Sequence, residues 1–548
     1  MTPGSVNNPS NSSSTVVRWL LAAGIASLLL RFWIAATFPI TGDEAFFYWW
    51  GVYPDWGYSD HPPMVGWLIA LMRATLGDSI WSIRLPVVLL PLGLGGVIWW
   101  GLKDIDKTRA AWGVLFFWLA PLNWLNTLIT TDTPLIFWSA MSVAALMRAE
   151  RRDQMDGRAY GLYALSGVFI GCAFLSKYFS VVLGLAYLVY FGLYRRERLA
   201  GLLLLVVCAL FGPAINIAYN MSHGWSNIMF NVYNRNEAEL FELRKPLLYV
   251  VMMAYLITPA ALWMGFKYRK ALWATTRGEQ PAAALGRPEQ GQPPRGAAQY
   301  AQRQAWRPVL RLLACVVVVP LLFFALLSVK KVIGLHWVLS FYPFGFAFLA
   351  FALPSDKLKS CAKGLALFAG LHVLLVAGLY MTSLDTWRAT APLSKLYPQV
   401  IRSYKTADIL KQVSSPGVVL MADAYTAASI YGFERRQYMP VFGVGRFHAR
   451  QDDMLVDFSL YQGKTIRVIT GGSPRLEEFT PYFDSVRVLT FMQSGVPFYA
   501  VEGVNFKYEA YRQGVLGEIF QRFYKIPKAL PMTGCPFCER YCGQVRCP

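Results

Sequence analysis

The chain has 548 residues, of which 55% are hydrophobic and only 15% are charged, and its formal net charge is +20. A soluble globule of this size needs more polar residues to cover its surface, and the apolar residues here come in long blocks, so composition excludes an ordinary soluble protein. The positive charge does not indicate a nucleic-acid partner, because the basic residues lie mainly in alternate loops between apolar blocks. We therefore expect a polytopic α-helical membrane protein surrounded by membrane lipids.

Blocks of roughly 20 apolar residues, the length that crosses a bilayer, predict about 11 transmembrane helices. They lie near residues 15–38, 84–102, 110–128, 134–147, 160–175, 179–194, 201–219, 247–266, 309–329, 337–353 and 364–382. Every second loop is basic, and cytoplasmic loops carry an excess of Lys and Arg. The basic loops are residues 103–109, 148–158, 195–198, 267–307 and 357–363. This alternation places the amino terminus in the cytoplasm and the region after the last span outside.

The domain boundaries follow from shifts in composition. We expect a cytoplasmic tail over 1–14 and a membrane domain over 15–384. Within it, residues 271–306 are rich in Ala, Gly, Gln, Pro and Arg without an apolar period, which predicts a disordered cytoplasmic loop. Short β-prone runs separated by turns and helical patterns predict a compact periplasmic α/β domain over 385–530. These runs include residues 417–421, 465–469 and 486–489.

The last segment, residues 531–548, holds four of the eight cysteines: Cys535, Cys538, Cys542 and Cys547. Their spacing is tighter than that of ordinary zinc sites, and a location outside the membrane favours oxidation, so two disulfides are the first interpretation. A metal knuckle and a flexible reduced tail are the alternatives.

Two acidic motifs follow the first span. Asp43 and Glu44 precede a run of five aromatic residues, 46–50, and Asp60-His61-Pro62-Pro63 lies further along the same loop. Asp132 stands in another outer connection, between two later spans. Acids at a membrane interface are costly and usually take part in chemistry or binding. The alternative is that Asp43 and Glu44 cap the helix that follows them, and that Asp132 caps the helix that begins at Pro134.

Cations gather on the same predicted face. Lys177 and the pair Lys330-Lys331 break the positive-inside rule; snorkelling explains each separately, and an anion at headgroup depth explains all three. Arg31, inside the first span, either snorkels or contacts a lipid phosphate or the acidic loop. Arg235 and His336 also fall on this face.

Acids and cations on one membrane face suit a reaction of a lipid-phosphate-linked substrate. Cations or a metal would hold the departing phosphate, and a carboxylate would take the proton of the attacking hydroxyl. A coupled transporter would instead place acids within its helices, and the predicted spans contain no Asp or Glu. A transporter or lipid flippase without chemistry is nevertheless the alternative from another class.

An ordered series of motifs resembles the bacterial branch of the protein mannosyltransferase and aminoarabinose transferase group, membrane glycosyltransferases of the C-type superfold. The resemblance covers roughly the first 350 residues, and residues 423–431 resemble the outer domain of the group more weakly. Its motifs are the acidic pair, residues 58–67, Ser82 to Pro86, Thr131 to Leu135, Phe174 to Tyr178, His336-Trp337 and Tyr342-Pro343.

The resemblance implies inverting transfer of a sugar from a polyprenyl-phosphate donor to a lipid, glycan or protein acceptor, at the outer side of the bacterial inner membrane. Carried over by position, Asp43 is the first-loop catalytic carboxylate, Glu44 supports it, and Asp132 helps to place acceptor or metal. Lys177 and Arg235 are candidates for the donor phosphate. In the aminoarabinose branch Glu-Lys precedes the proline pair, whereas Asp60-His61 precedes it here, which leaves a divalent metal at these two residues and the aminoarabinose substrate open.

Overall fold

The computed structural model describes residues 9–234, 242–277, 297–445 and 451–542. It divides into two compact units, each discontinuous in sequence. The first, the helical unit, comprises residues 1–36, 84–213 and 239–380; the second, the mixed unit, comprises 37–83, 214–238 and 381–548. The mixed unit therefore joins the loop that carries Asp43 and Asp60 to the C-terminal α/β region.

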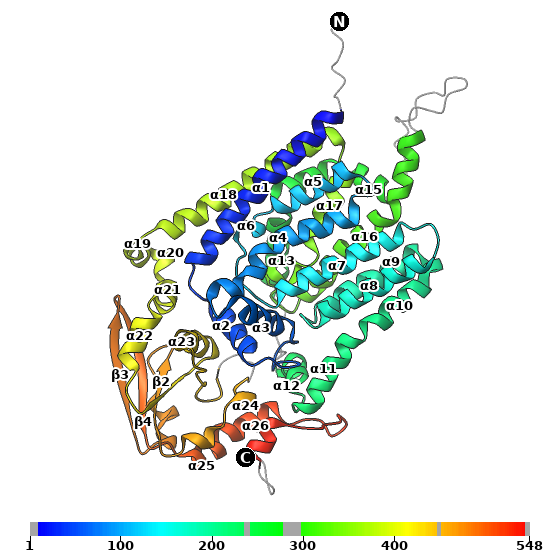
Figure 1. Ribbon diagram of the computed structural model, residues 1–548. Helices are drawn as coiled ribbons and strands as arrows, with labels where there is room; N and C mark the ends of the chain where they lie inside the picture. Colours follow the sequence, from blue (N-terminus) through cyan, green and yellow to red (C-terminus); the bar gives the residue numbers. More distant parts are fainter. Residues whose placement is uncertain (1–8, 235–241, 278–296, 446–450, 543–548) are drawn as a thin grey trace, which may run out of the picture. The chain divides into compact units, whose positions relative to one another are not determined.

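The helical unit is built from long apolar helices, of which α7, α8 and α9 lie side by side (Figure 1). Its helices are α1 (Pro9–Thr37), α4 (Ile80–Leu102), α5 (Lys107–Trp118), α6 (Leu122–Leu125), α7 (Asp132–Glu150), α8 (Gly157–Phe174), α9 (Ser180–Tyr194), α10 (Leu199–Ala209), α13 (Arg244–Ile257), α14 (Pro259–Lys267), α15 (Arg269–Arg277), α16 (Ala297–Ser328), α17 (Tyr342–Ala352) and α18 (Leu358–Met381), whereas most of α11 (Phe211–Ser222) belongs to the mixed unit. One contiguous core of buried apolar side chains joins them.

Within the described residues, five helical segments are long and apolar enough to cross a membrane: Ser14–Thr37, Ile80–Leu102, Arg196–Ser222, Trp306–Ser328 and Ser355–Met381. A sixth span is possible by the same criterion if α13 and α14 count together, although the two meet at an angle of 89° at Thr258. Three further apolar helices, α3 (Met64–Leu76), α9 and α17, are shorter. The number of helices that meet this criterion is thus below the 11 spans predicted, and the larger count stays a prediction.

The predicted disordered loop over 271–306 is too long, because both of its ends are helical. Its first residues continue α15 to Arg277, and its last residues belong to α16; residues 278–296 lie outside the described part of the chain. Leu272 packs on the helical core, and the Trp306 side chain is buried. The Arg311 side chain donates a hydrogen bond from Nε to the Thr276 carbonyl, 2.9 Å away. These contacts order two sequences whose composition alone favoured disorder.

The α/β part of the mixed unit contains a four-stranded sheet in the order β1-β2-β4-β3. Strands β1 (Val418–Ala422) and β2 (Thr465–Thr470) are parallel, and β4 (Val496–Val504) pairs antiparallel with β2 and with β3 (Ser485–Gln493). Strands β2, β3 and β4 are labelled in Figure 1. All three runs expected to be strands are confirmed. Ser494 and Gly495 join β3 to β4 with positive φ at both, the backbone of a tight hairpin.

Short helices surround this sheet and the loops of the mixed unit: α2 (Gly42–Val52), α3 (Met64–Leu76), α12 (Ser226–Met229), α19 (Leu384–Ala389), α20 (Ala391–Ser394), α21 (Tyr397–Tyr404), α22 (Thr406–Val413), α23 (Tyr425–Arg435), α24 (Asp452–Leu455), α25 (Tyr508–Tyr511), α26 (Gly517–Phe523) and α27 (Pro536–Tyr541). Alternate residues of the strands enter two apolar clusters. Leu420 and Ala422 pack with α23, whereas Met421 packs with the aromatic side chains of the later helices. The sheet is therefore covered on both faces.

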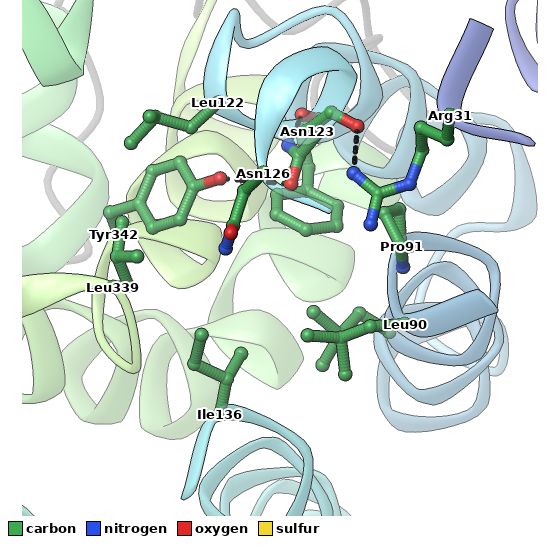
Figure 2. A pocket seen from close by; sticks show the side chains of 11 residues that line it. Arg31, Leu90, Pro91, Leu122, Asn123, Asn126, Ile136, Leu339 and Tyr342 are labelled. Carbon is green, nitrogen blue, oxygen red and sulfur yellow. Dashed lines mark hydrogen bonds between the residues drawn. The ribbon is translucent and has the colours of Figure 1, made fainter. Parts of the chain in front are cut away.

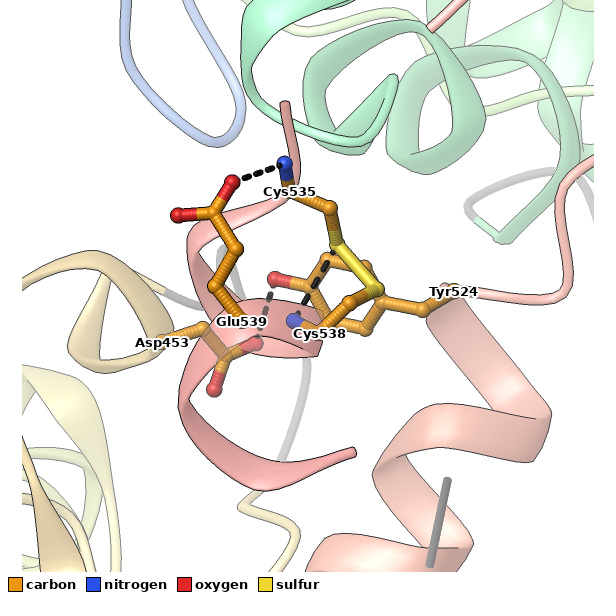
Figure 3. Close-up of a disulfide and its surroundings, with 5 residues drawn as sticks. All are labelled: Asp453, Tyr524, Cys535, Cys538 and Glu539. Atoms are coloured by element: carbon orange, nitrogen blue, oxygen red, sulfur yellow. Dashed lines mark hydrogen bonds between the residues drawn. A yellow bond between two sulfur atoms is a disulfide. The ribbon is translucent and has the colours of Figure 1, made fainter. Parts of the chain in front are cut away.

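The cysteine-rich tail folds back on the mixed unit. Cys535 and Cys538 form a disulfide, which confirms the oxidised interpretation for this pair (Figure 3). Cys542 is also disulfide-bonded, and Cys547 lies outside the described residues. The backbone of the tail joins the end of α11, where the Thr533 N–H donates to the Met221 carbonyl at 2.8 Å.

Candidate active site

The acidic pair opens α2, and its two carboxylates do different things. The Thr41 hydroxyl oxygen accepts from the Glu44 N–H at 3.4 Å, and the Glu44 carboxylate accepts from the Thr41 N–H at 3.2 Å. This reciprocal arrangement is a capping box, which satisfies two backbone donors at the helix start. Glu44 is fully buried, whereas the Asp43 side chain is exposed. The capping alternative thus holds for Glu44, and Asp43 is the carboxylate that can meet a substrate.

The chain after α2 is held by stacked aromatic rings. The Tyr58 ring lies parallel to the Trp50 ring at 4.3 Å, and its hydroxyl donates to the Trp50 carbonyl at 2.8 Å. A side chain at Gly66 would collide with the same hydroxyl, so glycine is required there. Burial raises the pKa of Tyr58 well above its ordinary value, so this phenol serves as a hydrogen-bond donor and not as a base.

The Asp60-His61 motif lies beside these rings. The His61 Nε2 atom is 3.8 Å from the Asp60 Oδ2 atom, and both side chains are largely buried. Two asparagines one helical turn apart hold the loop: Asn227 donates to the Tyr58 carbonyl at 2.7 Å, and Asn231 to the Asp60 carbonyl at 2.8 Å. No motif in the sequence marks these two asparagines as part of the site, although their i, i+4 spacing puts them on one helix face.

A metal at Asp60 and His61 stays a prediction. Among the residues that the structure describes, there is no group of three or more His, Cys, Asp or Glu side chains that could hold a metal ion. The two side chains would therefore supply only part of the coordination that a divalent cation takes.

In the helical unit, Asp132 and Lys177 form a buried ion pair. The Lys177 Nζ atom lies 2.9 Å from each Asp132 carboxylate oxygen, and the two residues are 8% and 5% exposed. Asp132 is the first residue of α7, but its carboxylate is directed to Lys177, which lies between α8 and α9. Capping of the helix therefore does not account for Asp132. In this structure the anion paired with Lys177 is a carboxylate of the protein itself.

The cations of the α16–α17 connection lie in the same unit as this ion pair. Lys330 and His336 are exposed, and Lys331 is half-buried. The loop reaches the residues beside Lys177 through aromatic contact, because the Trp337 and Phe179 ring centroids are 4.6 Å apart. The Lys177 ammonium also lies 5.3 Å from the centre of the Phe179 ring, a cation–π distance.

A further buried cation, Lys245, is not among the residues predicted from the sequence. Its ammonium donates to the Lys330 carbonyl at 3.1 Å. The signal was available in the sequence, because Arg244 and Lys245 lie just before the outer end of the expected span 247–266, where the positive-inside rule disfavours them.

Arg31 is 1% exposed and does not snorkel. Pro91 lacks the N–H that would bond the Val87 carbonyl four residues earlier in α4. The Arg31 guanidinium donates to that carbonyl, to Val88 O at 3.0 Å and to Asn123 O at 2.7 Å, the last bond being drawn in Figure 2. Arg31 thus satisfies the backbone at a proline position, and it lines a small cavity of about 20 Å³ with Tyr342. This placement gives it a structural task that the sequence did not suggest.

The predicted site residues therefore fall into two groups. Asp43, Glu44, Asp60 and His61 belong to the mixed unit, and the others described belong to the helical unit: Arg31, Asp132, Lys177, Lys330, Lys331 and His336. Arg235 lies outside the described residues. Each group pairs acid with base, and in the helical unit Lys177 engages both carboxylate oxygens of Asp132.

Comparison with known proteins identifies the class of fold. The chain is similar to ArnT from Cupriavidus metallidurans in the apo state, with a TM-score of 0.59 and 15% identity over 89% of this chain and 98% of that chain. It is equally similar to the same protein bound to undecaprenyl phosphate, with a TM-score of 0.59 and 15% identity over 88% and 98% of the two chains. The chain has the ArnT fold and, with its apolar helices, is a polytopic membrane protein.

Two sequence comparisons match parts of the chain to glycosyltransferases. The family described as dolichyl-phosphate-mannose-protein mannosyltransferase matches residues 60–217, which include Asp60, His61, Asp132 and Lys177. A Rhizobium johnstonii protein, lipid A galacturonosyltransferase RgtD, is 30% identical over 139 residues. That match spans 25% of this chain and 28% of the length of RgtD.

Proposed function

We propose that the protein is an inverting glycosyltransferase that moves a sugar from a polyprenyl-phosphate donor to a lipid acceptor at the outer face of the bacterial inner membrane. The observation that carries this proposal is an exposed carboxylate, Asp43, at the start of a buried helix, in a chain with the fold of ArnT. The likeness to a protein solved with undecaprenyl phosphate supports the donor class. The match to a lipid A galacturonosyltransferase supports a lipid acceptor over a glycan or protein acceptor.

The donor tail has a suitable place in the helical unit. A cavity of about 560 Å³ has an almost wholly apolar lining contributed by α8, α9, α10, α11 and α16. Tyr178, Phe179 and Ser180, which line it, directly follow Lys177 in the chain. Ligand cavities commonly measure about 300–1,000 Å³. In this proposal part of the isoprenoid chain occupies this cavity. The donor phosphate binds the Lys177 ammonium and replaces the Asp132 carboxylate as its partner.

The reaction then needs one proton transfer. The acceptor hydroxyl oxygen forms a bond to the anomeric carbon from the face opposite the phosphate, and the bond between that carbon and the phosphate oxygen breaks. Asp43 accepts the hydroxyl proton, and polyprenyl phosphate leaves with its charge met by Lys177 and the neighbouring cations. Glu44 supports Asp43 through the capping box. Backside attack inverts the anomeric centre.

The test is mass spectrometry of the envelope glycolipids, glycans and glycoproteins of cells with and without the protein. The proposal predicts loss of one sugar from a lipid and accumulation of its polyprenyl-phosphate form. Identical profiles in both strains, under conditions in which the protein is produced, would contradict it.

A further inference from the structure

Helix α2, whose second residue is Asp43, is held almost entirely by tertiary contacts. It has 11 residues, and every residue from Glu44 to Gly51 is buried. Isolated helices shorter than about 12–15 residues are marginal in water. The direction of the Asp43 carboxylate therefore depends on the elements packed around α2, which are α3 and α23.

Aromatic side chains join α2 to α23 of the α/β region. The Phe46 and Tyr425 rings meet edge to face with centroids 5.0 Å apart. The Tyr48 and Phe433 rings do the same at 4.8 Å, two turns further along α23. Such edge-to-face pairs favour particular ring geometries, so they fix the orientation of α2 relative to α23.

The tightest contact lies next to Asp43 itself. A Cβ atom at Gly42 would be 2.7 Å from the Thr426 Cβ atom and 2.9 Å from its methyl carbon, below any real contact distance. The Thr426 Cβ atom is bonded directly to the backbone and stays in place when χ1 rotates, so it cannot withdraw without moving α23. At the other end of α2, a Cβ at Gly51 would collide with Ile69 of α3. Glycine thus allows both neighbours to reach the α2 backbone.

The opposite face of α23 rests on the sheet. Ala427, Ala428 and Tyr431 lie in one buried cluster with Leu420 and Ala422 of β1. Close-packed interiors transmit displacement because they have few voids to absorb it. If the sheet moved, α23 would move with it, and the contact of α23 with α2 would then change the position of Asp43.

We propose that the C-terminal α/β region acts in catalysis by positioning Asp43, through the contact of Thr426 with Gly42. Thr426 is a positioning residue and does not touch the substrate in this account. The inference rests on the proposed function, because the role of Asp43 is measured as glycosyl transfer. By this inference the C-terminal α/β region, which lies far from Asp43 in the sequence, affects the rate of the chemical step.

The test is a double-mutant cycle on the purified full-length protein, with polyprenyl-phosphate sugar as donor. Gly42→Ala should lower kcat by about 10- to 100-fold with little change in the KM for donor, since a misplacement of 1 Å can cost about 100-fold. Thr426→Gly removes the opposing atoms and should restore most of kcat in the double variant. Gly472→Ala is the matched control, because a Cβ there meets no atom within 4 Å.

Thr426→Leu presses on Gly42 from the α23 side and should also lower kcat, so a Gly42→Ala variant that fails to fold leaves the proposal testable. Wild-type kcat in Gly42→Ala or in Thr426→Leu would overturn it. So would a double variant as slow as Gly42→Ala alone. A wild-type protein inactive with every donor offered would instead overturn the proposed function, which separates the two failures.

Discussion

Lys177, from the connection between α8 and α9, meets Asp132, the first residue of α7, in a buried ion pair with Nζ 2.9 Å from each carboxylate oxygen. Charges removed from water are stable only with a partner, so each residue fixes the other. In the proposed reaction the Lys177 ammonium binds the donor phosphate. In the absence of donor, the Asp132 carboxylate neutralises its charge.

Removing the acid of this pair should destabilise the protein. Asp132→Asn leaves the Lys177 ammonium buried without a counter-charge, which costs about 3–5 kcal/mol in comparable cases. The melting temperature of the detergent-purified variant measures this. Glu478→Gln is the control, because its Arg475 partner is exposed and such pairs contribute about 0–1 kcal/mol. Equal melting temperatures for Asp132→Asn and the control would show that the ion pair carries no stability.

Arg31 and Pro91 should be coupled energetically. Arg31→Met leaves the Val87 carbonyl without a donor, whereas Pro91→Ala supplies the backbone N–H that α4 lacks. We expect Arg31→Met to be destabilising and the addition of Pro91→Ala to recover part of the loss, with a coupling energy of about 0.5–3 kcal/mol. Thermal unfolding of the four proteins gives this energy. Strict additivity would mean that Arg31 does not serve the proline position.

Acid should weaken the sheet through Glu502. Burial alone would raise the pKa of this carboxyl, but hydrogen bonds and charge from Arg467 and Arg487 on the flanking strands hold its pKa below the ordinary value. A lowered folded-state pKa contributes stability above the unfolded pKa of about 4.3, and that stability is lost as the pH falls through the folded value. Melting temperatures at stepwise lower pH should therefore fall less steeply for Glu502→Gln than for the wild type. Parallel curves would contradict this.

Reduction should loosen the tail. The Cys535–Cys538 disulfide closes a short loop, for which the chain-entropy relation gives about 2 kcal/mol. The same segment is also held by the Tyr524 ring, which stacks on the Phe537 ring at 4.3 Å, and by the Cys535 N–H, which donates to the Glu539 carboxylate at 3.1 Å (Figure 3). The tail should therefore remain folded but melt earlier. Mass spectrometry after thiol alkylation, with and without reductant, should detect two additional labels at these cysteines only after reduction. Labelling without reductant would show that the pair is a dithiol.

Sequence patterns predicted the strands near residues 417–421, 465–469 and 486–489, because alternating β-prone runs between turns are a local signal. They also placed Asp43 and Asp132 at helix starts. They could not separate Asp43 from Glu44, because the capping box depends on which carboxylate folds back to Thr41. Nor could they pair Lys177 with Asp132 or Arg31 with Val87, since residues 45 and 56 positions apart meet only through tertiary packing. The helix ends around residues 271–306 were missed for the same reason.

The most direct test of the account is release of free polyprenyl phosphate from radiolabelled polyprenyl-phosphate sugars by the purified wild type, Asp43→Asn and Glu44→Gln. Glutamine can replace glutamate in a capping box, so Glu44→Gln is the matched control for loss of a carboxylate beside the site. The account predicts release by the wild type and Glu44→Gln and none by a folded Asp43→Asn. Undiminished release by Asp43→Asn would contradict the central role of Asp43, and absence of release by the wild type would favour a transporter or flippase.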